Sequence, residues 1–594
     1  MTNRRGFLLA GAATLPLGNA AIGGTEGASP RPFEIDGCRA WISFDGRLDD
    51  RDGLWRALDV AAPLASFSDA DLAAAALSVW GMDGLEKLHG SWALAILEPA
   101  RRRARIARDP LGGRCLSWSR SGAWVLASTS EARLVREIGA EDDLDRERIA
   151  AYFALEAPTE GRTFFRNVQQ LEPGQVLTIT SDRLTSTFLP RPRPALISPR
   201  ATAAERAEEF RHRLDLAVRS RLGNDRPAVL LSGGLDSSPI AACARAADPE
   251  RPLAAVSWTF ERFPRADERR YLDSLERHLG LEMARVPCDD ALPLVDFETW
   301  PVHPSTPEQN AYRLFHERAY RTAAERGWRV LLSGMCGDQL YAGAEFALRE
   351  RLRARDFEGA ARWALAAARR DRSSLREALG ALLPPSLRLE RSARRRAAQA
   401  SWLTDRAVSL LPDIVARDAW ANNYARPAQA LALLGPENGH GFAIERTYAE
   451  AFGLELRYPL RDRRVIEWML AVPAEDLADG GVERPILRRA FAGRLPSRVL
   501  DRVGKATFED LFVEGVHRQA QGQGRLERLR TDQVAAMNHR LGALCLCVAH
   551  RLGQRLGAVM AVGDDADFHA FISTRLRSAN PGCHYLFYLT NAPS

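Results

Sequence analysis

Residues 228–243 read AVLLSGGLDSSPIAAC, and this stretch decides the fold that we expect for the chain. It opens with a short apolar run, 228–231, of the kind that forms a buried parallel strand. The glycines after Ser232 break that strand. Ser237-Ser238-Pro239 then begins an apolar helical stretch, where a proline is tolerated in the first turn. A strand, a glycine turn and a helix N-terminus place unpaired backbone N–H groups around one anion, so we predict a phosphate-binding loop.

The residue types in this loop suit a nucleotide accompanied by a metal ion. Glycines let the backbone approach a phosphate closely, and serine hydroxyls add donors. Asp236 would repel phosphates unless a divalent metal were bound with them. The loop is not a Walker loop, because no Gly-Lys-Ser/Thr follows, and a plain glycine turn in an α/β core is the alternative. The candidate nucleotide-binding residues here are Leu230, Ser232, Gly233, Gly234, Asp236, Ser237 and Ser238.

The string SGGLDSS resembles the pyrophosphate loop of the ATP pyrophosphatase superfamily. The resemblance implies that ATP and Mg²⁺ bind here and that ATP is cleaved to AMP and pyrophosphate.

Composition narrows the class of protein. With 594 residues, the chain is long enough for two or three domains, and 46% hydrophobic and 27% charged residues are ordinary for a soluble globular protein. A net charge of +6 against 82 basic and 76 acidic residues does not indicate nucleic-acid binding. Eight scattered cysteines show neither zinc spacing nor a disulfide framework, and no stretch reaches the length of a membrane span. We expect a cytoplasmic enzyme.

The N-terminus allows two interpretations. Asn3-Arg-Arg-Gly-Phe-Leu-Leu9 and the Ala/Gly-rich residues after it look like a twin-arginine export signal. An exported enzyme would lose its supply of ATP, however. The alternative is that residues 6–11 form the first buried strand of the N-terminal domain.

Residues 33–190 read as short strands, with one helix over Asp69–Trp80 and a turn at Asp45-Gly46. The order of FDGRLDD, SVWGMDGLEKLHGSWALAILEP, RIARDPLGGRCLSWS, LASTSEARLV and LEPGQVLTI resembles the N-terminal domain of the asparagine synthetase family. The resemblance implies a class II glutamine amidotransferase-like β-sandwich of the Ntn type over residues 1–190. Such domains use an N-terminal cysteine as nucleophile, with its own α-amine as the base.

The nucleophilic cysteine that such a domain needs to hydrolyse glutamine is missing. Gly6-Phe7 matches the residues that follow the family's nucleophile, so Arg5 takes its place. Thr2 is out of register, and Cys38 and Cys115 are internal. We therefore predict a degenerate domain without glutaminase activity.

A proline-rich linker, 191–200, leads to a second domain, 201–530, followed by a tail at 531–594. Helices and strands alternate in the second domain. They are the helix 201–222, the strand 228–231 before the phosphate-binding loop, the strand AVSWTF (255–260), the helix 268–279 and the strand at 285–286. This order indicates a doubly wound parallel sheet, in which ligands bind at the carboxyl ends of the strands. By resemblance AVSWTF borders the adenine, through either Trp258 or Thr259. The fold class is thus α/β with two domains.

A second signature follows the buried strand at 328–332. SGMCGDQLYAG, 333–343, resembles the family's SGxGxDxxxxG but has Cys336 at the second glycine, which predicts a less open loop. The resemblance places Ser333 and Gly334 on the nucleotide and Asp338 beside Asp236 on magnesium. A helix N-cap is the alternative role of Asp338.

Two later segments complete the resemblance. ERTYAEAFGLELRYPLRDRRVIEWMLAV, 445–472, matches helices behind the active site, where structural roles suffice for Arg457, Pro459 and Asp462. Lys505 matches the lysine that the family places against the phosphates. The predicted catalytic residues are therefore Lys505, Asp338 and Asp236.

Members of the family form an acyl-adenylate that an amine then attacks, and they differ in the amine. Asparagine synthetases need ammonia from the glutaminase and carry Glu at the third position of SGxG, whereas β-lactam synthetases carry Tyr; this chain has Met335. The branch that remains resembles lasso-peptide macrolactam synthetases, which join an Asp or Glu side chain to a peptide's N-terminal amine. The implied partners are a precursor peptide, a leader peptidase and a leader-binding protein. The alternatives are a glutamine- or ammonia-dependent asparagine synthetase-like amidotransferase, a β-lactam synthetase-like cyclase, and a non-catalytic nucleotide- or peptide-binding scaffold.

Overall fold

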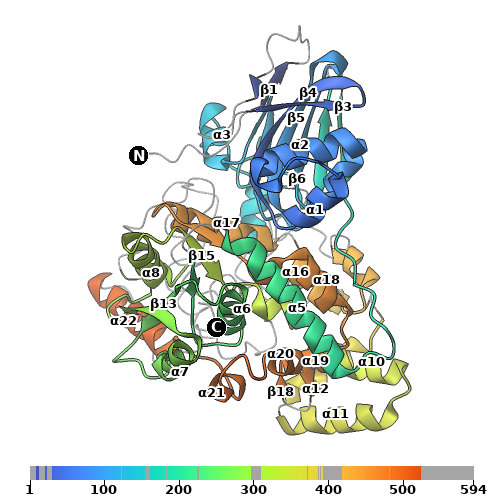
Figure 1. Ribbon diagram of the computed structural model, residues 1–594. Coiled ribbons are helices and arrows are strands. Elements are labelled where there is room, and N and C mark those ends of the chain that lie inside the picture. Colours follow the sequence, from blue (N-terminus) through green and yellow to red (C-terminus); the bar gives the residue numbers. More distant parts are fainter. Residues whose placement is uncertain are drawn as a thin grey trace.

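The computed structural model describes the backbone of 9–12 and 21–22 and most of residues 30–523. The gaps within 30–523 are 122–123, 154–160, 181–182, 224–226, 294, 296–309, 371, 385–386, 388–389, 392–417, 436 and 480–481. An N-terminal domain, blue in Figure 1, lies against a larger domain that runs from green to red. Every helix in the described ranges lacks the length and apolar character needed to cross a membrane.

The N-terminal domain packs two antiparallel sheets face to face. One has the order β11-β10-β6-β5-β4-β3 and the other β2-β1-β8-β7-β9. Small and branched apolar side chains, including Ala93, Ile106 and Leu177, fill the space between the sheets. The strands are β1 Leu9–Ala12, β2 Ala21–Ile22, β3 Arg31–Ile35, β4 Cys38–Leu48, β5 Gly90–Glu98, β6 Arg103–Arg108, β7 Ser117–Ser121, β8 Trp124–Ser128, β9 Gln169–Gln170, β10 Gln175–Ile179 and β11 Leu184–Phe188.

Helices cover the outer face of the first sheet. α2 (Asp69–Trp80), which is predicted over the same residues, begins at a capping box formed by Ser68 and Asp71. Its alanines and leucines pack on the apolar side chains of β4 and β5, and α1 (Arg51–Leu58) lies beside it. α3 (Glu131–Glu137) and α4 (Arg146–Phe153) form a smaller apolar cluster of their own. The predicted sandwich is confirmed.

One predicted turn is wrong. Residues Asp45 and Gly46 lie inside β4, which continues to Leu48 and pairs with β5 from Trp41 to Leu48. A Cβ added to Gly46 would lie 2.1 Å from the carbonyl oxygen of Ser91. Gly46 is therefore needed because β4 and β5 approach each other closely here, and not because the chain turns.

The N-terminal strand is present at residues Leu9–Ala12 and pairs with β8, with Leu9 opposite Ala127. It overlaps the strand predicted at residues 6–11. Residues 1–8, with Thr2 and Arg5, lie outside the described residues, as does the predicted tail at 531–594.

The second domain contains a parallel five-stranded sheet in the order β14-β13-β12-β15-β16. Neighbouring residues of its strands face opposite cores: Val229 packs on one side, and Ala228 and Leu230 on the other. Both faces are thus buried under helices, as a doubly wound fold requires. The strands are β12 Pro227–Leu230, β13 Leu253–Thr259, β14 Leu281–Pro287, β15 Val330–Ser333 and β16 Glu455–Arg457.

Helices α5 (Ala203–Leu222), α6 (Ser237–Ala247) and α7 (Arg269–Leu279) contribute to the core on one face, and α8 (Arg313–Glu325) and α17 (Glu437–Glu450) to that on the other. Most of the remaining elements also contribute buried side chains to these two cores. The remaining elements are α9 Gly337–Leu340, α10 Ala347–Arg353, α11 Phe357–Arg370, α12 Arg372–Ala381, α16 Pro427–Leu434, α18 Arg463–Ala471, α19 Ala474–Leu477, β17 Ala478–Asp479, β18 Val482–Glu483, α20 Pro485–Ala490, α21 Ser497–Leu500 and α22 Glu509–Gln523.

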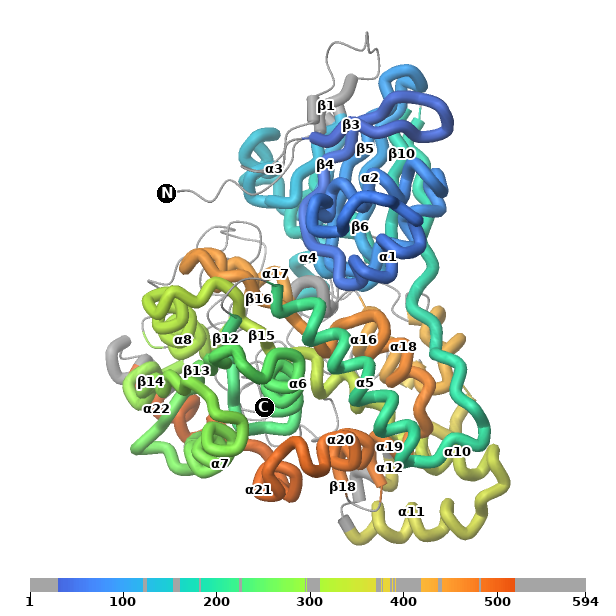
Figure 2. Tube along the Cα trace, viewed as in Figure 1, coloured from blue at the N-terminus to red at the C-terminus, as the bar shows by residue number. Residues whose placement is uncertain are grey.

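The connection between the domains has no helix or strand from residue 189 to residue 202, where a proline-rich linker is predicted. It follows the edge of the second domain to the start of α5 (Figure 2). The backbone N–H of Ala195 donates to the carbonyl of Glu467 at 2.8 Å, and the Tyr424 hydroxyl donates to the carbonyl of Pro192 at 2.8 Å. The linker is therefore attached to the second domain.

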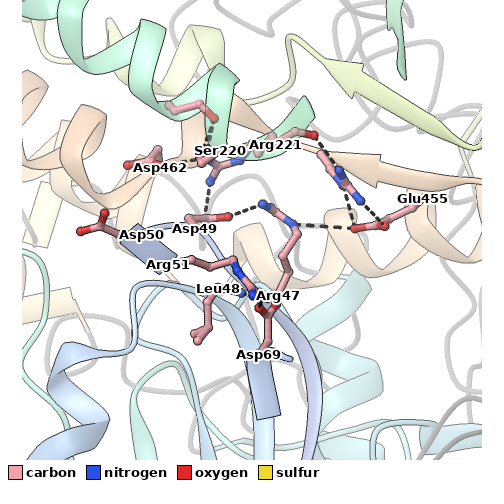
Figure 3. Close-up of polar contacts among 12 residues, drawn as sticks. Arg47, Leu48, Asp49, Asp50, Arg51, Asp69, Ser220, Arg221, Glu455 and Asp462 are labelled. Atoms are coloured by element: carbon pink, nitrogen blue, oxygen red, sulfur yellow. Dashed lines mark hydrogen bonds and ion pairs between the residues drawn. The ribbon is translucent and has the colours of Figure 1, made fainter. Parts of the chain in front are cut away.

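Buried charges join the two domains (Figure 3). Arg221, at the end of α5, forms ion pairs with Asp49 of the N-terminal domain at 2.5 Å and with Asp462 at 2.7 Å. Arg47 also pairs with Asp49, and Arg457 donates to the carbonyl of Arg221 at 2.7 Å. Asp462 is thus the link between the family-like segment 445–472 and the N-terminal domain.

Candidate active site

Two loops meet at the carboxyl end of the parallel sheet. β12 and β15 are neighbours, and Leu230 pairs with Ser333 at their last residues. The loop 231–236 after β12 and the loop 334–336 after β15 therefore start side by side. Both predicted signatures lie at one edge of the sheet, where doubly wound folds bind ligands.

The serines of the first loop hold its shape. The N–H of Ser232 donates to Ser237 Oγ at 3.1 Å, and the N–H of Gly234 donates to Ser232 Oγ at 3.3 Å. The Ser238 hydroxyl donates to the carbonyl of Gly234 at 2.6 Å. Gly233 has φ +72°, and a Cβ there would lie 2.8 Å from the Cβ of Tyr271, so only glycine suits this position. Contact of these residues with phosphate stays a prediction.

Glycines also allow the second loop to lie against the first. A Cβ on Gly334 would be 2.8 Å from the backbone N of Ser237, and one on Gly337 would be 2.0 Å from Asp236 Oδ1. The two motifs thus depend on each other, because neither loop could approach the other with a side chain at these positions. Leu230 packs its side chain into the core, so any contact with a nucleotide would come from its backbone.

Cys336 adopts the left-handed conformation that the glycine of the SGxGxD pattern would favour. Its φ is +80° and its ψ is 0°. Its side chain is buried in the core beside the sheet, and burial raises the pKa of the thiol to about 12. The thiol is therefore neutral and packed inside, and the backbone path of the loop is kept at the cost of strain.

The two predicted metal carboxylates converge on one cation. Arg484 donates through one terminal nitrogen to Asp236 and through the other to Asp338, the latter at 2.5 Å. Lys505 also donates to Asp338. Burial opposes the charge of Arg484, but the two carboxylates outweigh burial and raise its pKa above its ordinary value. The three predicted catalytic residues thus lie together, with an arginine that the sequence did not single out.

The arrangement fits a magnesium ion that arrives with a nucleotide. Two carboxylates that reach the same guanidinium also come within reach of one small cation, and Mg²⁺ is typically held by one or two carboxylates plus phosphates. Among the described residues, no cluster of three or more acidic, histidine or cysteine side chains suits a metal by itself. Asp236 and Asp338 would therefore hold the ion, and it would offset negative charge on the phosphates.

Two more residues support the first loop. Arg502 donates to the carbonyl of Gly233 at 3.2 Å and pairs with the buried Glu268, and its guanidinium lies 4.4 Å from the centre of the Tyr271 ring. Burial raises the pKa of Glu268 to about 7 despite Arg502. Arg502 lies three residues before Lys505. The sequence alone does not connect the two residues, and only the fold shows that Arg502 contacts the first loop and that Lys505 contacts Asp338.

The sequence left open whether Trp258 or Thr259 borders the adenine, and these two residues differ in their surroundings. The Trp258 indole donates to the carbonyl of Phe315 at 2.7 Å and packs on the rings of Phe315 and His316, so it belongs to the core. Thr259, its alternative, ends β13.

Met335 packs partly buried against the core on the α6 side, and its N–H donates to Ser333 Oγ at 3.2 Å.

A glycine-rich loop and two carboxylates at the end of a doubly wound sheet define the site of a nucleotide-dependent synthetase. The profile of the family described as asparagine synthase matches residues 209–547, and that of a glutamine amidotransferase domain matches residues 3–188. The chain belongs to the asparagine synthase family and is an ATP-dependent amide-forming ligase.

Curated relatives span both domains. A Mycobacterium tuberculosis (strain H37Rv) protein, named provisionally a glutamine-hydrolyzing asparagine synthetase, is 27% identical over 74% of this chain and 70% of its own length. Asparagine synthetase 1 of Bacillus subtilis (strain 168), also named glutamine-hydrolyzing, is 24% identical over 80% of this chain and 76% of its own. A solved regulatory enzyme of purine biosynthesis is 15% identical over 48% of this chain and 68% of its own, with a TM-score of 0.22, too low to support an argument.

Proposed function

We propose that this ligase closes a peptide ring. It would activate an Asp or Glu side chain of a short, leader-cleaved peptide and join it to the N-terminal amine of the same peptide, as in lasso peptides. The observation that carries this proposal is Met335, an apolar side chain packed against the core at the third position of the SGxG signature. A reaction at this site needs an amine that requires little help in losing a proton.

A peptide α-amine meets that requirement. Its ordinary pKa is about 8, so a substantial fraction is neutral near pH 7. Free ammonium is protonated and therefore lacks this neutral fraction, unless a glutaminase releases ammonia within the enzyme. Met335 cannot accept a proton, so the site would act mainly by holding the amine against the activated carboxyl group.

The N-terminal domain supports the same choice. Arg5 is predicted to take the place of the nucleophilic cysteine. The five cysteines in the described part of the chain are free, and Cys115 of this domain is buried. Where the domain meets the synthetase domain, Arg47 and Asp49 join the buried charge network. We infer that the domain serves as structure and does not supply nitrogen.

The proposed chemistry has two steps that balance. A carboxylate oxygen attacks the α-phosphorus of ATP, the bond to the bridging oxygen breaks, and pyrophosphate leaves. The peptide amine then attacks the acyl carbon, AMP leaves with its oxygen, and one proton is released. Lys505 and the loop N–H groups would stabilise negative charge on the phosphates, and the metal held by Asp236 and Asp338 would neutralise it further.

The test uses the full-length protein with ATP, Mg²⁺ and synthetic peptides that carry an N-terminal Gly and an Asp or Glu several residues later. The expected products are AMP, pyrophosphate and a peptide lighter by one water and resistant to aminopeptidase. An N-acetylated peptide is the matched control and should not cyclise. ADP as product would falsify the adenylation chemistry.

The names of the relatives favour a second candidate, a glutamine-dependent asparagine synthetase-like amidotransferase. Release of glutamate from glutamine, coupled to amidation of aspartate, would support that candidate and overturn ours. Our proposal expects neither product. It also includes a leader peptidase and a leader-binding protein as partners, and a cytoplasmic location where ATP is available.

A further inference from the structure

Arg484 has an unusual setting for a buried cation. Its guanidinium contacts two carboxylates from two different loops, and only 7% of its side chain is exposed. It also lies 4.9 Å from the centre of the Tyr341 ring. Its backbone has φ +56° and ψ +49°, a left-handed conformation that is costly for arginine. Strain of this kind persists only where surrounding structure enforces it, and it is concentrated at functional sites.

The contacts of Arg484 coincide with those of the expected metal. Asp236 and Asp338 are the carboxylates that would hold Mg²⁺, and Arg484 bonds to Oδ1 of each. A divalent ion at the same two oxygens would be pressed against a cation, and like charges at contact distance in a buried site repel strongly. The guanidinium and the metal therefore cannot both keep these positions.

We propose that Arg484 is a resident counter-cation that competes with the divalent metal for Asp236 and Asp338. It neutralises the two carboxylates and holds the two loops together before the nucleotide binds. The metal that arrives with the nucleotide then displaces it from the carboxylates. A consequence is that the nucleotide-free enzyme binds the metal weakly, so that the metal enters as its complex with ATP. The inference rests on the metal role of both aspartates in the proposed function.

The test measures binding of Mn²⁺ alone to full-length, nucleotide-free protein by electron paramagnetic resonance. Arg484→Met removes the competing charge, and we expect it to bind Mn²⁺ roughly tenfold or more tightly than the wild type, a change of about 1.4 kcal/mol. Arg489→Met is the matched control, because Arg489 lies in α20, which begins directly after Arg484, but it pairs with Asp476 at 2.9 Å. The control should bind Mn²⁺ as the wild type does.

Stability gives a readout independent of turnover. In EDTA, Arg484→Met should unfold at a lower temperature than the wild type, since the buried Asp236 and the partly buried Asp338 lose a shared partner. Adding Mn²⁺ should raise the unfolding temperature of Arg484→Met by more than it raises that of the wild type, and so restore much of the loss. A purely structural arginine would give the same Mn²⁺ effect in both proteins, and that result would overturn the proposal.

Arg484→Gln removes the charge but keeps hydrogen-bond donors for the carboxylates, and it serves as the test variant if Arg484→Met does not fold. We expect it to bind Mn²⁺ more tightly than the wild type, and wild-type affinity would contradict the competition. A final titration adds the non-hydrolysable analogue α,β-methylene ATP. If the wild type and the variants bind Mn²⁺ equally tightly without the analogue, only the proposed competition is overturned. If none of them binds Mn²⁺ even with the analogue, the metal site itself is overturned.

Discussion

Arg221 of the synthetase domain and Asp49 of the N-terminal domain form an ion pair in which both side chains are buried, with 2% and 7% exposure. Arg221 donates through its other terminal nitrogen to Asp462, and Arg464 also donates to Asp462. Burial opposes the charge on Asp462, but the two arginines prevail and hold its pKa well below its ordinary value. The N-terminal domain is therefore fixed to the helix region behind the active site by charges that depend on one another.

Arg221→Met should weaken this interface severely. Breaking a buried pair by removing one partner typically costs about 3–5 kcal/mol, because the remaining charges stay buried. By calorimetry we expect one thermal transition for the wild type and two for Arg221→Met, because the domains lose their coupling. Arg219→Met changes an exposed arginine of the same helix and should leave the transition unchanged. An Arg221→Met protein that melts like the wild type would show that the network does not couple the domains.

Asp236→Asn and Asp338→Asn should each lower pyrophosphate release by roughly 10²–10³-fold, the range seen when one preorganised electrostatic group is removed. Asparagine keeps the shape but is a poorer ligand for Mg²⁺ than a carboxylate. The measurement is pyrophosphate release with the peptide substrate, with circular dichroism as the check that the fold is kept. Asp476→Asn is not a suitable control, because that carboxylate pairs with Arg206 and Arg489. Asp273→Asn is suitable, because this aspartate of α7 is exposed and its ion pair with Arg285 lies at the surface, whereas Asp476 is buried.

Lys505→Ala and Met335→Ala separate charge stabilisation from packing. Lys505 is partly exposed and donates to Asp338, so we expect its loss to lower kcat by about 10²-fold with a small change in ATP affinity. Met335 supplies only packing, and its truncation should reduce kcat by less than about tenfold. The measurements are steady-state kinetics and ATP binding for each variant. The reverse order of effects would contradict the proposed function, because packing at Met335 would then matter more to turnover than the charge of Lys505.

The sequence contained enough to place the sheet and its two loops. A buried strand followed by glycines and a helix start leaves few conformations, which is why 228–243 and 333–343 appear where they were predicted. Arg484 could not be found in this way, because its partners lie 248 and 146 residues away in the chain. The Asp45-Gly46 turn was wrong for a related reason. The need for glycine there comes from β5, which a local pattern does not contain.

Cys336 offers a test of backbone strain at the second loop. At φ +80°, alanine should be less stable than glycine by about 1 kcal/mol, the reverse of the usual order of these residues in a helix. Both variants lose the same buried thiol, so their difference isolates the backbone. Chemical denaturation of Cys336→Ala and Cys336→Gly measures it. Greater stability of the alanine variant would show that the loop is not held in the left-handed conformation.

Glu131 predicts a pH dependence in the N-terminal domain. This carboxyl accepts a hydrogen bond from the Ser117 hydroxyl at 2.9 Å, and burial raises its pKa from 4.5 to about 7. Between these two pKa values the folded state holds a proton that the unfolded state has released, so this group makes stability fall as pH rises toward 7. Glu131→Gln mimics the protonated form. It should therefore leave the melting temperature nearly unchanged at pH 5 and raise it by a few degrees at pH 8, a gain of about 1–3 kcal/mol. Glu137→Gln, at an exposed position of the same helix, is the matched control and should show no such difference between the two pH values. Equal shifts for Glu131→Gln at pH 5 and pH 8 would mean that Glu131 titrates normally in the folded protein.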